Sequence, residues 1–312
     1  MADSTSLSGV LNLNKPVGKT SHDCVYFARR LFHMKKIGHT GTLDPLASGV
    51  LPVLVGSAAK LSEYLMNHDK TYRATVRFGL TTDTEDITGA VLSQSSSIPD
   101  IDAVREASRA FIGEISQTPP MYSAVKVDGR KLYEYARKGV SADDIKIEPR
   151  KVNVYSLAVL ETLRPDEYTL DIACSKGTYI RSICAGIGKS LGCGAVMSAL
   201  VRTSSGCFSI EDSHTQEKLE AESSPVKYLI PTANILETLS DKSICLPEFY
   251  LKLAKNGAEI YISKLGITAG FSEGDKVIMK DEQGSPFALG EAGIYDKNKD
   301  ENIAVKAKAF ID

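Results

Sequence analysis

The alternation of apolar and polar residues predicts several strands along the chain. The clearest is TYRATVRFGL (71–80), in which Tyr72 begins an apolar row that would face the interior, while threonines and arginines fill the other positions. The earlier segment GVLNLNK predicts a short strand that ends before Pro16. Further along, EYTLDIAC predicts another strand, which turns at Gly177 into a helix. The chain therefore contains strands and helices in mixed order.

Helical periodicity is strongest in the segment 20–38. Thr20 and Asp23 form a capping box, basic residues occupy the last turn, and Gly38 is predicted to end the helix. A second helix is predicted over 100–112. The helix after Gly177 has an apolar inner face formed by Ile180, Ile183, Cys184, Ile187 and Leu191.

The stretch HTGTLDPLASG (39–49) places one carboxylate, Asp44, directly before a proline and between two glycines. A residue before proline is excluded from the helical region, and Gly41 and Gly49 allow the backbone to bend. The apolar run VLPVLVG follows. Asp44 is therefore expected in a shaped loop that leads into a buried strand. An ordinary turn aspartate that caps backbone N–H groups remains the alternative.

Arg181 falls in the first turn of the helix after Gly177. A cation at a helix N-terminus is unfavourable unless an anion pairs with it. Asp44 is a candidate for that anion, although the sequence alone does not place the two residues together.

Two segments differ in character from the rest of the chain. The stretch TPPMYSAVKVDGRKLYEYARKGV opens with prolines and carries five basic residues and three tyrosines. Interleaved basic and aromatic residues suit RNA, because phosphates attract cations and exposed bases stack on rings. A solvated amphipathic loop and helix is the alternative. The tail from about residue 244 predicts a small all-β module of short strands.

Charge is divided unevenly along the chain, although the net charge is only −2. Residues 1–210 carry 25 Lys and Arg against 21 Asp and Glu, residues 211–312 carry 12 against 18, and no arginine follows Arg202. This break predicts two domains, with any phosphate-binding surface on the first. The chain shows no apolar run of 18 residues and no signal-like N-terminus, so a soluble, cytoplasmic protein without a membrane partner is expected.

The sequence does not support three other kinds of site. GKT in PVGKTS lacks a P-loop glycine, because Leu13 stands at that position, which argues against a nucleotide-dependent ATPase. The six cysteines form no CxxC pair and accompany no histidine cluster, so neither a metal site nor a disulfide framework is expected. They are predicted to be small apolar core residues. The acidic TTDTEDITG lacks the spacing of a calcium loop.

Five motifs in collinear order over roughly 9–210 carry a resemblance to a known family. They are GVLNLNKPVGKTSHD, GHTGTLDPLASGVLPVLVG, KTYRATVRFGLTTDTEDITG, PPMYSAVKVDGRKLYEYARKG and CSKGTYIRS. Together they resemble the TruB family of bacterial tRNA pseudouridine synthases, which act on uridine 55 of the T-loop. The resemblance implies an α+β pseudouridine synthase fold over 1–240, with flanking helices on a mixed, mostly antiparallel sheet. It also implies an RNA-binding insertion at about 117–151 and a PUA-like all-β domain at 241–312.

The resemblance also implies the roles of particular residues. Asp44 matches the catalytic aspartate, Tyr72 the active-site tyrosine, and Arg181 the arginine that pairs with the aspartate. Asp86 matches a second carboxylate that supports this arginine. His39 matches a histidine that stacks into the T-loop as the target base leaves it. The other residues expected to bind substrate, through a backbone contact to uracil or through phosphates, are Leu200, Lys15, Lys126, Arg130, Lys131 and Arg202.

The chemistry that the resemblance implies needs a carboxylate but no cofactor. Pseudouridine formation breaks N1–C1′, turns the uracil and joins C5 to C1′, so neither a redox cofactor nor ATP is required. An ionised Asp44 can attack C1′, add to C6, or remove the 2′ proton to give a glycal, and we favour the third route. A guanidinium near Asp44 would oppose the rise in its pKa that burial causes. The expected enzyme is a monomer that binds the tRNA T-stem-loop. A non-catalytic tRNA-binding or folding module is the alternative.

Overall fold

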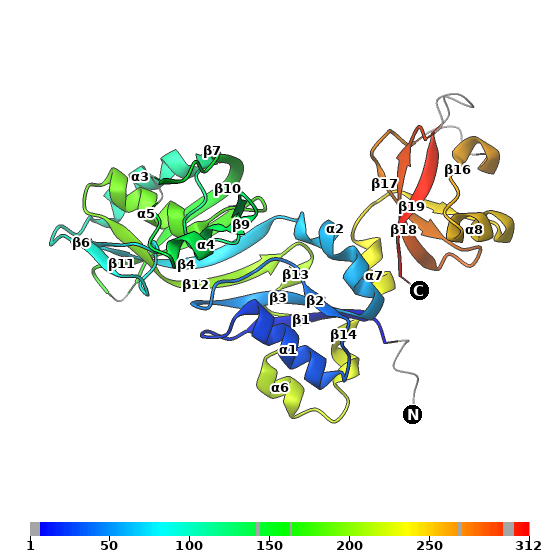
Figure 1. The fold of residues 1–312 in the computed structure, drawn as a ribbon, viewed down its shortest axis with the longest axis horizontal. Coiled ribbons are helices and arrows are strands. Elements are labelled where there is room, and N and C mark those ends of the chain that lie inside the picture. Colours follow the sequence, from blue (N-terminus) through cyan, green and yellow to red (C-terminus); the bar gives the residue numbers. More distant parts are fainter. Residues whose placement is uncertain (1–6, 142–143, 163, 267–269, 296–302, 312) are drawn as a thin grey trace.

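The computed structural model describes residues 7–141, 144–162, 164–266, 270–295 and 303–311. Figure 1 shows an elongated molecule in which a large sheet is followed by a smaller sheet toward the C-terminal end. The larger sheet has ten strands among the described residues. Their bounds are β1 Gly9–Lys15, β2 Ile37–His39, β3 Ala47–Val55, β4 Lys70–Phe78, β7 Gly113–Gln117, β10 Arg150–Glu161, β11 Glu167–Cys174, β12 Ala195–Ser205, β13 Phe208–Ser209 and β14 Leu229–Ile230.

The strand order of the larger sheet is β14-β1-β3-β12-β4-β11-β10-β7, with β2 paired to β3 and β13 paired to β12. β3 and β12 run parallel, with Leu200 opposite Ala47. The other neighbours in the order run antiparallel. The predicted mixed, mostly antiparallel sheet is therefore confirmed. The parallel pair brings the start of β3 beside the middle of β12, next to β4.

Helices lie on this larger sheet, in the segment between β7 and β10, and beside the smaller sheet. Their bounds are α1 Ser21–Leu31, α2 Ser62–Met66, α3 Ile101–Ser108, α4 Leu132–Ala136, α5 Ile180–Ser190, α6 Gln216–Glu220, α7 Thr232–Glu237 and α8 Glu248–Lys255, with 3₁₀ turns at η1 Gly56–Leu61, η2 Arg109–Phe111, η4 Pro225–Tyr228 and η5 Ile262–Leu265. In the part of the chain that is described, no helix combines the length and apolar character needed to cross a bilayer.

α1 begins as the sequence predicts but ends earlier. The Thr20 hydroxyl accepts from the Asp23 N–H at 3.1 Å, and the Asp23 carboxylate accepts from the Thr20 N–H at 2.8 Å. The predicted end at Gly38 is wrong, because the helix ends at Leu31 and His33 takes a left-handed φ of 52°. Residues 37–39 instead form β2, which satisfies their backbone groups by pairing with β3.

The predicted inward row of β4 is confirmed within the strand. Tyr72, Ala74, Val76 and Phe78 are buried, and they pack in one core cluster with residues of α3 and α5. Leu80, which was expected to continue the row, is half-buried in the short hairpin of β5 (Leu80–Thr82) and β6 (Val91–Gln94).

A second sheet follows the first and shares a core with it. Its strands are β15 Ser243–Cys245, β16 Ile260–Tyr261, β17 Lys276–Lys280, β18 Pro286–Gly293 and β19 Ala304–Phe310, in the order β15-β17-β18-β19-β16. Val10 and Leu54 of the first sheet lie in one apolar cluster with Ile278 and Leu289 of the second. The tail also contains α8, which the strand pattern did not predict. The domain boundary at 240 and 241 stays a prediction.

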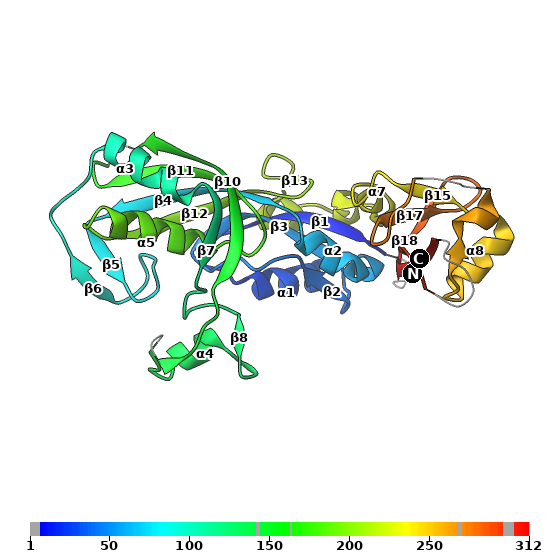
Figure 2. The same cartoon turned by 90° about the horizontal axis from the view of Figure 1, so that it is seen from above.

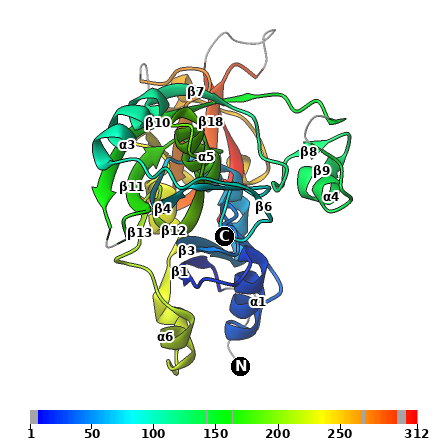
Figure 3. The ribbon, with the colours of Figure 1, turned by 90° about the vertical axis from the view of Figure 1, so that its left-hand side faces the viewer.

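The segment between Gln117 and Arg150, which pair across β7 and β10, leaves the sheet as a separate excursion. It contains a small hairpin of β8 (Lys126–Val127) and β9 (Arg130–Lys131), followed by α4. Figure 2 and Figure 3 show this excursion projecting well away from the sheet. Its position matches the insertion that the sequence indicated at about 117–151.

The cysteines only partly follow the prediction that they fill the core. Cys24, Cys174, Cys184 and Cys193 are buried, but Cys207 and Cys245 are exposed. Both exceptions lie at the ends of short strands or turns, where a side chain has no core to face.

Candidate active site

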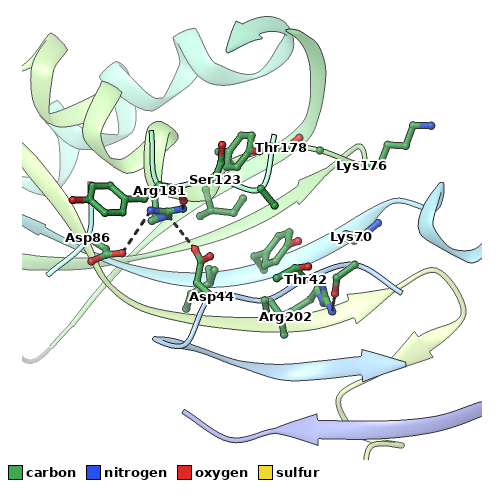
Figure 4. Close-up of a pocket in the computed structure, with 18 of the residues that line it drawn as sticks. Thr42, Asp44, Lys70, Asp86, Ser123, Lys176, Thr178, Arg181 and Arg202 are labelled. Atoms are coloured by element: carbon green, nitrogen blue, oxygen red, sulfur yellow. Dashed lines mark hydrogen bonds and ion pairs between the residues drawn. The ribbon is translucent and has the colours of Figure 1, made fainter. Parts of the chain in front are cut away.

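Asp44 lies on the loop between β2 and β3, and the segment around α1 holds that loop in place. Leu43 is buried, and its N–H donates to the Ser21 hydroxyl at 2.9 Å. The Gly18 N–H donates to the carbonyl of Pro45 at 2.8 Å. Because both neighbours of Asp44 are anchored, its side chain has a defined direction, into the pocket shown in Figure 4.

The two glycines that flank Asp44 have separate structural reasons. Gly41 has a φ of 78°, in the left-handed region that favours glycine. Gly49 has a φ of 100°, and a Cβ there would lie 2.3 Å from the carbonyl oxygen of Arg202. The second glycine therefore permits the close parallel pairing of β3 with β12.

The guanidinium of Arg181 contacts four residues from three segments of the chain. Nε lies 3.0 Å from Oδ2 of Asp44, and Nη1 lies 3.8 Å from Oδ2 of Asp86. Nη1 also donates to the carbonyl of Thr84 at 2.9 Å, and Nη2 donates to that of Tyr122 at 3.0 Å. The side chain of Arg181 is 5% exposed. The cation in the first turn of α5 thus has the anionic partners that its position requires.

Asp86 is itself held by its own turn. Its Oδ1 accepts from the Thr88 hydroxyl at 2.6 Å, from the Thr88 N–H at 2.9 Å and from the Thr84 hydroxyl at 2.9 Å. Beside it, the Ser182 hydroxyl donates to the carboxylate of Glu85 at 2.6 Å. These bonds fix the β5–β6 turn against the start of α5, so the acidic turn supports the position of Arg181.

The environment of Asp44 has opposing effects on its pKa. Burial in the pocket raises the pKa of Asp44, and the guanidinium of Arg181 opposes that rise. Asp86 raises the pKa further, whereas Lys15 lowers it. The side chain of Asp44 is still 39% exposed, so it can meet a ligand. Arg181 therefore favours the ionised carboxylate in a site that otherwise disfavours charge.

Asp44 and Arg181 line a pocket of about 900 Å³, which is large enough for a nucleotide. Its walls come from the loop before β3, from β4, β12, the β5–β6 turn, the start of α5 and the insertion. Among the residues predicted from the sequence, the pocket brings together Asp44, Tyr72, Asp86, Arg181, Leu200 and Arg202.

Tyr72 and Arg202 are neighbours in this pocket. Tyr72 is 9% exposed, and burial raises the pKa of its hydroxyl while the guanidinium of Arg202 opposes the rise. The guanidinium of Arg202 is held from behind, because Nε donates to the carbonyl of Val50 at 2.7 Å. Tyr72 is therefore a neutral phenol with a ring in the pocket wall.

Lys15 and His39 do not line the pocket. Lys15 is fully buried, and Nζ donates to the carbonyls of Pro16 and Lys19 at 2.9 and 2.6 Å. The expectation of an exposed phosphate contact is corrected, since this ammonium is used inside the loop. His39 is half-buried at the end of β2 and does not line the pocket.

The predicted cations of the insertion lie outside the pocket. Lys126 and Arg130 are exposed, and Lys131 is half-buried with Nζ 5.5 Å from the ring centroid of Tyr133. Arg137 of the same insertion does line the pocket.

Several residues that line the pocket were not singled out from the sequence, notably Lys70, Ser123 and Lys176. Each carried a signal. Lys70 precedes Tyr72 by two positions and so shares its face of the strand. Ser123 and Lys176 lie inside the motifs PPMYSA and CSKGTYIRS. The hydroxyl of Ser123 is buried and has no hydrogen-bond partner. Among the described residues, no group of three His, Cys, Asp or Glu side chains is placed to hold a metal ion.

Family models match two adjoining parts of the chain. One, described as TruB family pseudouridylate synthase (N terminal domain), matches residues 29–180. The other, described as tRNA pseudouridylate synthase B C-terminal domain, matches residues 181–234. Proteins named tRNA pseudouridine synthase B from Alkaliphilus oremlandii and Caldanaerobacter subterraneus subsp. tengcongensis are 46% and 47% identical over 259 and 244 residues. These alignments cover 83% and 76% of this chain and 85% and 84% of the relatives.

Solved structures resemble this chain over nearly its whole length. A Cbf5–Nop10–Gar1 complex matches with a TM-score of 0.72 and 28% identity, covering 97% of this chain and 85% of that chain. An H/ACA RNP bound to a substrate RNA containing 2′-deoxyuridine matches with a TM-score of 0.71 and 26% identity, covering 99% and 86%. The predicted fold class, a pseudouridine synthase fold followed by a small all-β PUA-like domain, is confirmed. The chain belongs to the TruB family of pseudouridylate synthases.

Proposed function

We propose that this protein isomerises uridine 55 in the T-loop of tRNA to pseudouridine, with Asp44 as the catalytic carboxylate. The observation that carries the proposal is the 3.0 Å contact between Asp44 and Arg181, inside a nucleotide-sized pocket of a TruB-family chain. A carboxylate that is partly exposed in a pocket and paired with a buried guanidinium suits chemistry on a bound ligand better than it suits a turn.

Asp44 would act on a uridine that has left the base stack. Flipping costs a few kcal/mol, which stacking and hydrogen bonds in the pocket offset. The carboxylate then removes the 2′ proton, attacks C1′ or adds to C6. In each route N1–C1′ breaks, C5 bonds to C1′, and the C5 proton leaves. The reaction has no net redox change and needs no cofactor. We favour removal of the 2′ proton.

Tyr72 would hold the detached uracil. Its ring lies in the pocket wall, and burial raises the pKa of its hydroxyl, so the phenol stays protonated. A neutral phenol can pass a proton on only by donating its own as it accepts another. We therefore assign stacking to the ring and relay of the C5 proton to the hydroxyl. The backbone of Leu200, on the neighbouring strand β12, is assigned to the uracil edge.

The insertion would bind the T-stem-loop. Its exposed cations Lys126 and Arg130 can contact phosphates, and Arg137 extends the same charge into the pocket wall. His39 lies outside the pocket, which suits contact with the loop that the base has left. We also propose that the chain acts as a monomer, divided into domains at 1–240 and 241–312.

The test is release of tritium from C5-labelled uridine in a T-loop transcript. The intact chain should release it, and Asp44→Asn should lose release by a factor on the order of 10³ or more while RNA binding changes only a few-fold. Binding without any release by the intact chain would favour the non-catalytic tRNA-binding module. Full release by Asp44→Asn would remove Asp44 from the chemistry.

A further inference from the structure

The pocket is electrostatically divided into two ends. Figure 4 shows Asp44, Arg181 and Asp86 toward one side, and Lys70, Lys176 and Arg202 toward the other. At the first end the cation lies between two carboxylates. At the second end, which we call the cationic end and define as Lys70, Lys176 and Arg202, three cations lie near one another.

The cations of the cationic end are held by neutral groups. Nζ of Lys70 donates to the carbonyls of Met66 and His68 at 3.2 and 2.5 Å. Nζ of Lys176 donates to the side-chain carbonyl of Asn67 at 2.6 Å.

Arg202 completes the cationic end in the same way. Its Nε donates to the carbonyl of Val50 at 2.7 Å, and its Nη2 donates to that of Gly41 at 3.3 Å. None of the ion pairs found within the described ranges involves a residue of the cationic end. The hydrogen bonds orient the cations without neutralising them.

Two of the three cations are deeply buried, and burying a charge without an anionic partner is energetically costly. Lys70 is 7% exposed and Arg202 is 1% exposed. Burial, together with repulsion from Arg202 and Lys176, lowers the pKa of Lys70 to about 8, against the opposing effects of Cys174 and Asp69. Buried charges are normally paired or bound to a ligand. An anion that enters with the substrate would relieve both the burial and the repulsion.

We propose that the cationic end binds one of the two backbone phosphates that flank the flipped uridine. The inference rests on the proposed function and adds a subsite to it. The sugar and base would face Asp44 while a neighbouring phosphate lies against Lys176 and Lys70. Fixing a phosphate at one end sets the position of C1′ at the other, so the cationic end also positions the reacting bond.

The experiment uses T-loop RNAs in which one flanking linkage at a time is a neutral methylphosphonate. Binding to the intact chain should weaken about tenfold at one of the two linkages and little at the other. Lys176 is exposed, so Lys176→Ala should fold, and it should lose a similar factor with the unmodified RNA. For Lys176→Ala, placing the methylphosphonate at the sensitive linkage should weaken RNA binding little beyond the loss that the substitution already causes. The slope of log Kd against log salt should fall by about one.

Lys189→Ala is the matched control, because Lys189 is an exposed lysine in the last turn of α5 and does not line the pocket. It should keep the full methylphosphonate penalty. If Lys176→Ala also keeps the full penalty, the subsite is wrong. Tritium release by the intact chain, measured in parallel, separates the two proposals. If the chain isomerises the RNA but Lys176→Ala keeps the methylphosphonate penalty, only the phosphate subsite is wrong. Absence of isomerisation removes the proposed function.

Discussion

The two sheets of the molecule treat charge in opposite ways. Around the larger sheet the chain buries charged side chains, which are Lys15, Lys70, Asp86, Arg181 and Arg202. In the described part of the second sheet, from β15 to β19, every buried side chain is apolar. There the charged residues form partly exposed pairs such as Lys276 with Glu291 and Lys306 with Glu259.

This difference indicates what each sheet does. Removing an ion from water costs several kcal/mol even after relaxation, so a sheet that needs only stability leaves its charges at the surface. Five charged side chains are nevertheless buried around the larger sheet, and four of them line one pocket. We infer that buried charge in this chain marks the candidate active site, and the predictions below test that inference.

After Asp44→Asn, Arg181→Met should give the largest effect, because it leaves Asp44 and Asp86 without their shared cation. Burial already raises the pKa of Asp44, and loss of the guanidinium removes the opposing effect. In the proposed mechanism the active form of Asp44 is the ionised carboxylate, so activity should rise with pH through this pKa. The acid limb of the pH profile should therefore move to higher pH in Arg181→Met. Turnover at neutral pH should fall on the order of 10²-fold.

The pH profile of tritium release measures the effect of Arg181→Met. Arg181→Lys serves as the comparison, because lysine keeps the positive charge but lacks the several N–H donors of the planar guanidinium. It should recover part of the pH profile. An acid limb that stays in place in Arg181→Met would contradict the pairing.

Tyr72→Phe should have the next largest effect, on turnover rather than on binding. The ring keeps its surface for the proposed stacking, while the hydroxyl that is proposed to relay the C5 proton is lost. We expect RNA affinity within a few-fold of the intact chain and tritium release slowed by about 10²-fold. Single-turnover release gives the rate, and RNA binding gives the control. Undiminished release would leave Tyr72 with stacking alone.

Ser123→Ala should have a smaller effect that depends on the pocket. Its hydroxyl is buried, unpaired and part of the pocket wall, so it is free to bond to the nucleotide. We expect kcat/KM to fall about tenfold, the equivalent of one hydrogen bond. Ser108 is the matched control, since it is also buried and unpaired but lies on α3 outside the pocket. Equal losses in Ser123→Ala and Ser108→Ala would indicate a packing effect instead.

Local patterns in the sequence predicted much of this site. The proline and glycines around Asp44 predicted its loop, and the alternation around Tyr72 predicted the buried face of β4. From local patterns alone the contact between Asp44 and Arg181 was only a candidate, although the family resemblance implied it, because the contact depends on the long-range pairing of β3, β12 and β4. Such pairing leaves no local signal.

Other features depend on partners that are distant in the sequence or invisible in it. Lys70 lies on the inner face of β4, where a sequence pattern would not place a charged side chain. It can be buried there because Nζ donates to the carbonyls of Met66 and His68. Lys15 was expected to bind a phosphate, yet its ammonium donates to the carbonyls of Pro16 and Lys19 inside the loop. The early end of α1 follows from the pairing of β2 with β3, which helical periodicity does not report.

The smallest effect on stability and activity is expected for an ion pair of the second sheet, between Lys276 and Glu291. Lys276 and Glu291 are 37% and 32% exposed, so their pair is screened by water and Lys276→Met should change the free energy of unfolding by less than about 1 kcal/mol. Tritium release should not change. Arg73→Met offers a matched test in the larger sheet, because Arg73 pairs with Asp171 on the exposed face of β4 at 57% and 38% exposure. Equally small effects in denaturant unfolding would show that burial, and not the choice of sheet, decides what a charge contributes. A cost of several kcal/mol for Lys276→Met alone would mean that the second sheet also relies on its charges, and the contrast between the sheets would fail.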